Sequence, residues 1–145
     1  MNFWTESVFI TSIISWFIAQ LIKVITVIIN DKRLDFRRFV GSGGMPSSHA
    51  SFVTALTTSV GLIEGFSSVN FAICAVLSLI VMYDAAGVRR AAGQQAKILN
   101  KIVEEWENAD FGHTDKRLKE LLGHTPFEVF AGALLGIAIA ILRHY

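Results

Sequence analysis

The chain turns at Gly41-Ser42-Gly43-Gly44-Met45-Pro46-Ser47-Ser48-His49, a glycine-rich stretch that runs directly into the apolar segment 50–66. The glycines allow backbone N–H groups to converge on an anion, and Ser47 or Ser48 can cap the helix that follows. The positive end of that helix would point at the same place, with His49 beside it as a proton donor or acceptor. The stretch predicts a phosphate-binding loop. The alternative is an ordinary turn with an N-cap, in which His49 merely lies at a membrane surface.

Composition indicates an integral membrane protein. Of the 145 residues 52% are hydrophobic, and the mean hydropathy is +0.50, which is high for a soluble protein of this length. The net charge of +1 gives no general attraction toward nucleic acid. The single cysteine, Cys74, can form no intrachain disulfide, so a disulfide-stapled secreted domain is excluded.

The hydrophobic pattern predicts an all-α fold, in which one domain forms an integral membrane bundle of about four transmembrane helices. We expect the third span to continue as one long helix out of the membrane, because no helix breaker follows it. The predicted spans are approximately 7–29, 50–66, 71–90 and 126–142, and a soluble helical insert is expected at about 91–123.

Basic residues indicate the side of the membrane on which the loops lie. Apart from Lys23 and Arg143, every Lys and Arg lies in 30–40 or in 89–119. Four crossings with the N-terminus outside would place both segments on the cytoplasmic side of the cell membrane. The glycine-rich loop and the later motifs would then share that face.

Two polar residues, Gln20 and Lys23, interrupt the first span. Helical spacing places them on one face, which favours an orientation into the bundle or toward the glycine-rich loop. Snorkelling of Lys23 to the headgroups is the alternative. In the linker that follows, Arg37 and Arg38 lie a few residues before the loop and could reach it.

The last span opens with a capping box. Thr125 is the expected N-cap, Pro126 stands at the first helical position, and Glu128 follows three residues after the cap. This gives Glu128 a complete structural explanation without catalysis.

Three ordered motifs carry a resemblance to a known family. Pro-Ser-Ser-His opens a helix, Tyr-Asp-Ala-Ala-Gly-Val-Arg-Arg ends at Arg90, and His124 is followed four residues later by a carboxylate. With Lys23 on the first span, the chain resembles the type-2 phosphatidic acid phosphatase and vanadium haloperoxidase superfamily. It is most similar to the small divergent membrane branch described as acid phosphatase/vanadium-dependent haloperoxidase-related, and the resemblance covers nearly the whole chain.

The resemblance implies a role for each of these residues. His124 would be the nucleophile that takes the phosphoryl group, Glu128 the carboxylate that orients it, and His49 the acid that protonates the leaving oxygen. No metal or other cofactor is implied. The groups expected to hold the phosphate oxygens are Lys23, Gly44, Ser47, Ser48, and Arg89 or Arg90, with Gln20, Arg37, Arg38 and Asp84 as additional candidates.

The motifs depart from the superfamily pattern at several points. Lys23 has Asn30 at the spacing where the superfamily places Arg-Pro, and the chain contains no Arg-Pro. This chain has Pro-Ser-Ser-His where the superfamily has Pro-Ser-Gly-His, and it has Glu128 where the superfamily has Asp. The Arg and His of the third motif are close in sequence in the superfamily, whereas the whole insert separates Arg90 from His124 here.

Two functions remain open from the sequence. The first is a membrane phosphatase that hydrolyses a lipid phosphate or diphosphate, of isoprenoid or glycerolipid type, through a phosphohistidine. The second is a non-catalytic membrane protein that binds an anionic lipid headgroup or a partner. A haloperoxidase is disfavoured, because those relatives are soluble and hold vanadate. Gly132 and Gly136 are spaced for close helix contact, either inside the fold or in a homo-oligomer.

Overall fold

The computed structural model describes residues 3–31, 44–108 and 123–145, and within these ranges the chain forms helices and no strands. The predicted all-α architecture is therefore confirmed for the described part of the chain. The region 109–122 of the predicted insert, and Arg37 and Arg38, lie outside the described residues. The helices are α1 (Phe3–Asp31), α2 (Ser48–Glu64), α3 (Val69–Tyr83), α4 (Arg89–Asn108) and α5 (Pro126–His144), and the π-helical turn η2 (Asp84–Val88) joins α3 to α4.

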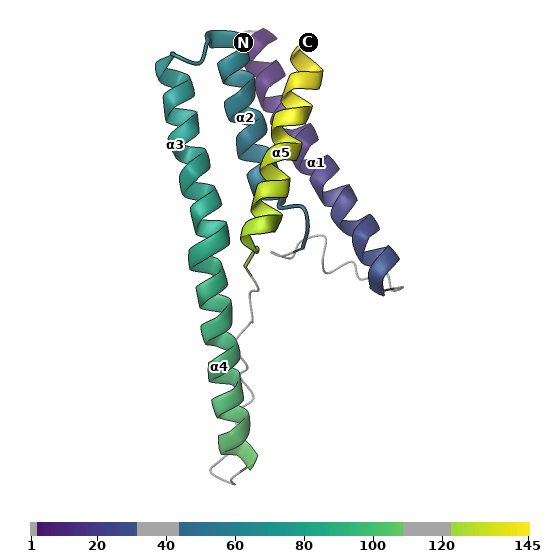
Figure 1. Ribbon diagram of the computed structural model, residues 1–145, viewed down its shortest axis with the longest axis vertical. Coiled ribbons are helices and arrows are strands. Elements are labelled where there is room, and N and C mark those ends of the chain that lie inside the picture. Colours follow the sequence, from purple (N-terminus) through teal and green to yellow (C-terminus); the bar gives the residue numbers. More distant parts are fainter. Residues whose placement is uncertain (1–2, 32–43, 109–122) are drawn as a thin grey trace.

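The helices that form the bundle run alternately in opposite directions (Figure 1). The beginning of α1 and the end of α5 lie at the same end of the bundle, and α4 extends away from the opposite end. The start of α2 and the start of α5 lie close together at that opposite end. The chain thus brings the end of its glycine-rich loop, from Gly44 onward, close to its His124 motif.

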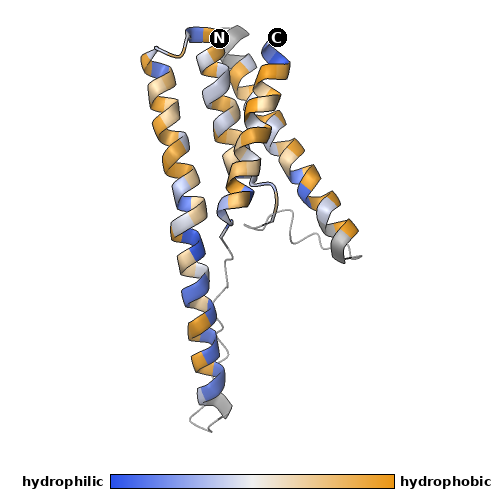
Figure 2. Cartoon of the chain, in the orientation of Figure 1, coloured by the Kyte–Doolittle hydropathy of each residue, from blue (hydrophilic) through white to orange (hydrophobic). Residues whose placement is uncertain are grey.

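One long helical rod from α3 to α4 was predicted, and the structure corrects this in one detail. The rod is continuous, but its middle is a π-turn in which the Arg89 N–H donates to the Asp84 carbonyl. Its span of 38 residues from Val69 to Trp106 is about 57 Å long at ~1.5 Å per residue. A hydrocarbon core is only about 30 Å thick. The rod therefore has to leave the membrane, as its polar lower part in Figure 2 indicates.

Small and hydroxylated residues fill the interior of the bundle. Helix α2 packs against α1, α3 and α5, and its buried side chains are short, such as Ala50, Ser51 and Ala55. Large apolar side chains point outward, for example Phe9 at 58% and Leu79 at 64% exposure. This inverted pattern is what a lipid-facing bundle requires, because helices in lipid associate by close packing of small residues.

Hydroxyl groups connect the helices at three places. Lipid offers no competing water, so such hydrogen bonds are well suited to the interior of a membrane bundle. The contacts join Ser15 Oγ to Ser51 Oγ at 2.6 Å, Thr54 Oγ1 to the Ala133 carbonyl at 3.1 Å, and Thr57 Oγ1 to Ser78 Oγ at 2.7 Å.

The Gly-x-x-x-Gly pair of α5 lies against α2 within the same chain. A Cβ at Gly132 would collide with the Ser47 carbonyl oxygen, and a Cβ at Gly136 would collide with Thr54 Oγ1. Both glycines are buried. Of the two alternatives left by the sequence, the pair therefore serves the fold, and it is not exposed for a contact between chains.

Three helices are long and apolar enough to cross a membrane, at Ser7–Thr26, within Val69–Trp106, and at Pro126–His144. Four spans were predicted. Among the described residues, three helices meet the criteria of length and apolar composition for a span. Helix α2 has only 17 residues and is rich in buried hydroxyl groups. It lies between the other helices, which shield its polar surface.

Candidate functional site

The His124 motif is fixed by the predicted capping box, which the structure confirms. Thr125 is the N-cap of α5 and Pro126 is the first helical residue. The Thr125 hydroxyl accepts from the Glu128 N–H at 3.3 Å, and Glu128 Oε2 accepts from the Thr125 N–H at 3.1 Å. The residue just before the cap, His124, is consequently held at the end of the helix.

The same carboxylate oxygen of Glu128 also reaches the histidine. His124 Nδ1 lies 3.1 Å from Glu128 Oε2. An ionised carboxylate can only accept, so Nδ1 carries the proton and the lone pair of the neutral ring lies on Nε2. That Nε2 atom is buried and makes no hydrogen bond to any residue that the structure describes. The cap and the orienting contact are therefore compatible functions of one side chain.

Burial determines the charge of His124. The residue is 2% exposed, and this desolvation lowers the pKa of His124 below its ordinary value of 6.5, an effect that the hydrogen bond from His124 to Glu128 opposes. The positive charges of Lys23 and Arg89 also act to lower it. The ring is thus neutral near pH 7, with Nε2 available as a nucleophile or a base.

Backbone contacts bring together the two motifs that the insert separates in sequence. The His124 N–H donates to the Ala85 carbonyl at 3.2 Å. Gly123 lies directly against the backbone of Arg89 and Arg90, where a Cβ would collide. The insert consequently changes the sequence distance between Arg and His without removing their proximity, and Gly123 is the residue that allows it.

The π-turn η2 carries the charged end of this second motif. Arg89 Nε donates to Asp84 Oδ2 at 2.7 Å, with both side chains partly exposed. The charge of Arg89 acts on both His49 and His124. Arg90 is exposed, and its charge is not among those that act on the two histidines. Arg89 is therefore the member of the pair nearer to the histidines. This turn was not predicted from the sequence, because its local sequence does not distinguish it from an α-helix, although such turns are frequent at functional sites.

The glycine-rich loop ends in a cap that faces α5. Ser47 is the N-cap of α2, and its hydroxyl accepts from the Ala50 N–H at 3.4 Å. The Ser47 N–H in turn donates to the Glu128 carbonyl at 3.0 Å. Ser47 and Ser48 are buried. The start of α2 is therefore joined to the first turn of α5.

His49 completes the arrangement from the first turn of α2. Its ring centroid lies 6.4 Å from that of His124, in an edge-to-face orientation with an interplanar angle of 60°. The charges of Arg89, Lys23 and Asp84 all act on it. The two imidazoles therefore lie beside each other, one held by a carboxylate and the other more exposed.

Lys23 approaches the two histidines from α1, and its charge acts on both. Its side chain is 3% exposed, which agrees with an orientation into the bundle and not with snorkelling. A Cβ on Gly44, which has φ of +88°, would lie 3.4 Å from Lys23 Cγ, so the stem of Lys23 passes beside the loop. Gln20, one helical turn before, is also buried.

Comparisons with known proteins identify the family of the chain. The chain matches the family described as "Divergent PAP2 family" over residues 4–139. The uncharacterized membrane protein YuiD of Bacillus subtilis (strain 168) is 42% identical, in an alignment that covers 100% of this chain and 98% of the relative. No solved structure matches significantly. Since the family match covers residues 4–139 and the relative from Bacillus subtilis aligns with the whole chain, the chain is a membrane protein that belongs to the divergent PAP2 family.

Proposed function

We propose that the protein is a membrane phosphatase that hydrolyses a lipid phosphate or diphosphate through a phosphohistidine on His124. The observation that carries the proposal is the buried Nε2 of His124, which has no hydrogen-bond partner among the described residues, on a ring whose Nδ1 is held by Glu128 at 3.1 Å and whose neighbour is His49. A carboxylate that fixes the tautomer and stabilises the charged ring is the arrangement that makes a histidine an effective nucleophile or base.

The first half of the reaction transfers the phosphoryl group. The Nε2 lone pair attacks phosphorus, the bond from phosphorus to the lipid oxygen breaks, and that oxygen takes a proton from His49. Lys23, Arg89 and the N–H groups at the start of α2 would compensate charge on the phosphoryl oxygens. The positive end of the α2 dipole adds to this attraction.

The second half returns the enzyme to its starting state. A water attacks the phosphoryl group on His124, the P–N bond breaks, and the proton of the water goes to His49. Inorganic phosphate is released and His124 is neutral again. His49 thus acts as the acid in the first step and as the base in the second, while His124 is first the nucleophile and then the leaving group.

The site is proposed to lie at the cytoplasmic face of the cell membrane. Arg89, Arg90, Lys97 and Lys101 all lie on α4, at the end of the bundle opposite the two termini. Such an excess of basic residues favours the cytoplasmic side.

The decisive experiment is phosphate release by the purified protein across a panel of isoprenyl and glycerolipid phosphates. Wild type should turn over at least one of them, and His124→Ala should lose that activity. Turnover should survive a chelator and be inhibited by vanadate, which mimics five-coordinate phosphorus. A complete loss with chelator that a divalent ion restores would assign a metal-dependent reaction instead. Tight binding of these lipids without turnover would assign the protein as a lipid-phosphate binder.

A further inference from the structure

An apolar groove begins at His49 and runs along α2 between α1 and α3. It has a volume of about 350 Å³, and the residues that line it are Ile13, Trp16, His49, Phe52, Val53 and Val81. Three of these, His49, Phe52 and Val53, share one face of α2 at i, i+3 and i+4. The groove is open on the lipid side, where Ile13 is 43% and Trp16 38% exposed. We call it the His49 groove.

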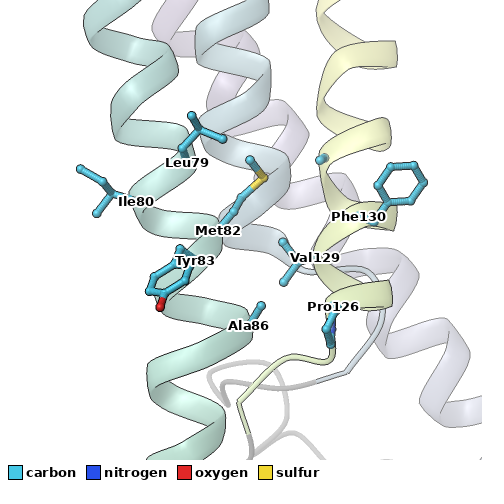
Figure 3. A pocket seen from close by; sticks show the side chains of 9 residues that line it. Leu79, Ile80, Met82, Tyr83, Ala86, Pro126, Val129 and Phe130 are labelled. Atoms are coloured by element: carbon cyan, nitrogen blue, oxygen red, sulfur yellow. The ribbon is translucent and has the colours of Figure 1, made fainter.

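A second and larger groove lies between α3 and α5, with a volume of about 730 Å³. Figure 3 shows its lining, which includes Leu79, Met82, Pro126 and Phe130. We call it the α3–α5 groove. It begins at the first turn of α5, beside the residue that holds His124, and His49 is not among its lining residues.

The geometry of phosphoryl transfer distinguishes between the two grooves. The attacking and leaving atoms lie roughly in line on opposite sides of phosphorus. With His124 attacking, the leaving oxygen and the carbon chain attached to it point away from His124 and toward His49. A hydrocarbon chain that starts at this oxygen meets the His49 groove first, because His49 itself forms part of its wall.

The chemistry of the walls restricts the kind of chain. Apart from the imidazole of His49 and the indole N–H of Trp16, the lining side chains contain only carbon and hydrogen. Val53 is one helical turn from His49, which is about 6 Å along the axis, so the wall is apolar almost from the leaving oxygen onward. A diacylglycerol would bring two ester groups into this part of the groove. Burying such polar groups without hydrogen bonds is unfavourable.

We propose that the His49 groove binds the leaving group of the substrate, and that the substrate is a monophosphate of a single hydrocarbon chain, such as an isoprenyl or alkyl phosphate. The chain enters sideways from the bilayer through the opening between α1 and α3. This inference rests on the proposed function, because it takes the roles of His124 and His49 from it.

The first test uses matched variants on one helix. Val81→Phe fills the His49 groove, whereas Leu79→Phe, two residues away on α3, places the same ring in the α3–α5 groove. The measurement is chain selectivity, the ratio of kcat/KM for farnesyl phosphate to that for ethyl phosphate. We expect it to fall at least about tenfold in Val81→Phe and to stay within about twofold of wild type in Leu79→Phe. If Val81→Phe does not fold, Ile13→Phe on α1 serves in its place, because Ile13 is more exposed.

Wild type should also prefer farnesyl phosphate over dioctanoyl phosphatidate by at least about tenfold in kcat/KM. An equal or greater rate with the phosphatidate overturns the single-chain assignment. A fall in chain selectivity in Leu79→Phe but not in Val81→Phe moves the chain to the α3–α5 groove and overturns the proposal.

The second test does not depend on turnover. A farnesyl phosphonate with a diazirine on its chain cannot be hydrolysed, and its crosslinks can be mapped by mass spectrometry. Crosslinks at Trp16, Phe52 or Val81 support the proposal, and crosslinks confined to Leu79 or Phe130 contradict it. If these crosslinks form in the His49 groove while wild type releases no phosphate from any substrate, the proposed phosphatase reaction fails and the lipid site stands. If phosphate is released but the crosslinks lie elsewhere, the lipid site fails and the reaction stands.

Discussion

The carboxylate of Glu128 serves a helix cap and a histidine through one oxygen atom. Its Oε2 lies 3.1 Å from both the Thr125 N and His124 Nδ1. The side chain is 21% exposed, whereas that of His124 is 3% exposed. A change at Glu128 therefore affects a shallow structural contact and a deeply buried chemical one, and the two effects have different sizes.

We expect Glu128→Gln to lose turnover while the fold is kept. Glutamine also serves in a capping box, so the helix should lose about 1 kcal/mol or less. The neutral amide no longer stabilises the charged ring of His124, so the rate should fall on the order of 100-fold or more. Phosphate release and thermal unfolding in detergent measure the two effects separately.

The matched comparison is the double variant with His124→Ala. Because the two residues act as a unit, the double variant should be little worse than His124→Ala alone. If Glu128→Gln keeps near-wild-type turnover while His124→Ala is inactive, Glu128 has only its structural role in the helix cap and does not orient His124.

The pH dependence of His124 provides a second prediction at this scale. Burial lowers the pKa of His124 below 6.5. The ring therefore stays neutral until the pH falls to this lowered pKa, and only below it does protonation of Nε2 remove the nucleophile. The acid limb of kcat/KM should therefore lie below pH 6.5. Glu128 acts to raise the pKa of His124, so Glu128→Gln should move its titration to still lower pH. NMR of isotope-labelled histidine can follow this directly, and a shift to higher pH would contradict the assigned contact.

The π-turn η2 sets the rotation between α3 and α4. The Arg89 N–H donates to the Asp84 carbonyl in a hydrogen bond of the i to i+5 type, and the Ala85 carbonyl of this turn accepts the N–H of His124. Removing one residue would restore an α-helix and rotate everything before it by about 100° relative to α4. The element is therefore a positioning device for Arg89 and for the His124 segment.

Deletion of Gly87 should abolish turnover while the helix content stays unchanged. The matched control is Gly87→Ala, which keeps the length, and a Cβ there meets nothing within 4 Å. Alanine favours the helix, so this control should retain its activity and unfold at the same or a slightly higher temperature. Circular dichroism and phosphate release measure the two properties. Wild-type activity in the deletion variant would show that the π-turn does not position the site.

The contact between α5 and α2 depends on glycine. We expect Gly136→Ala to destabilise the protein by about 1–3 kcal/mol, because its Cβ would overlap Thr54 Oγ1 and the backbone of Ser51. The unfolding temperature in detergent measures this, with Gly87→Ala as the control for an open helical glycine. If Gly136→Ala instead loses an oligomer on size-exclusion chromatography while its unfolding temperature is unchanged, Gly136 contributes to a contact between chains.

At the scale of the whole molecule, the arrangement predicts which positions share a side of the membrane. Met45 before α2 and Glu105 on α4 lie at one end of the bundle, and Phe66 between α2 and α3 lies at the other. Single cysteines at these exposed positions, in a chain with Cys74→Ser, should label from one side for positions 45 and 105 and from the opposite side for 66. Labelling of positions 45 and 105 from opposite sides would contradict the shared site.

Most helices of the described part could be predicted from the sequence, because apolar length and capping residues act locally. The capping box at Thr125 and Glu128 needs only adjacent residues, and the structure has it as expected. The number of spans does not follow from local pattern in the same way, because the short helix α2 buries hydroxyl groups among its neighbours. Hydropathy alone does not report such shielding.

The sequence by itself determined the helical membrane class, the family and the residue types of the candidate site, since composition and motif order suffice for these. Only the tertiary structure decided which motifs meet. Gly123 against the backbone of Arg89 and Arg90 closes the distance that the insert opens, and the 6.4 Å between His49 and His124 arises from the packing of α5 on α2. The physical reason is that helices form through contacts a few residues apart, whereas a site forms through close packing between helices distant in sequence.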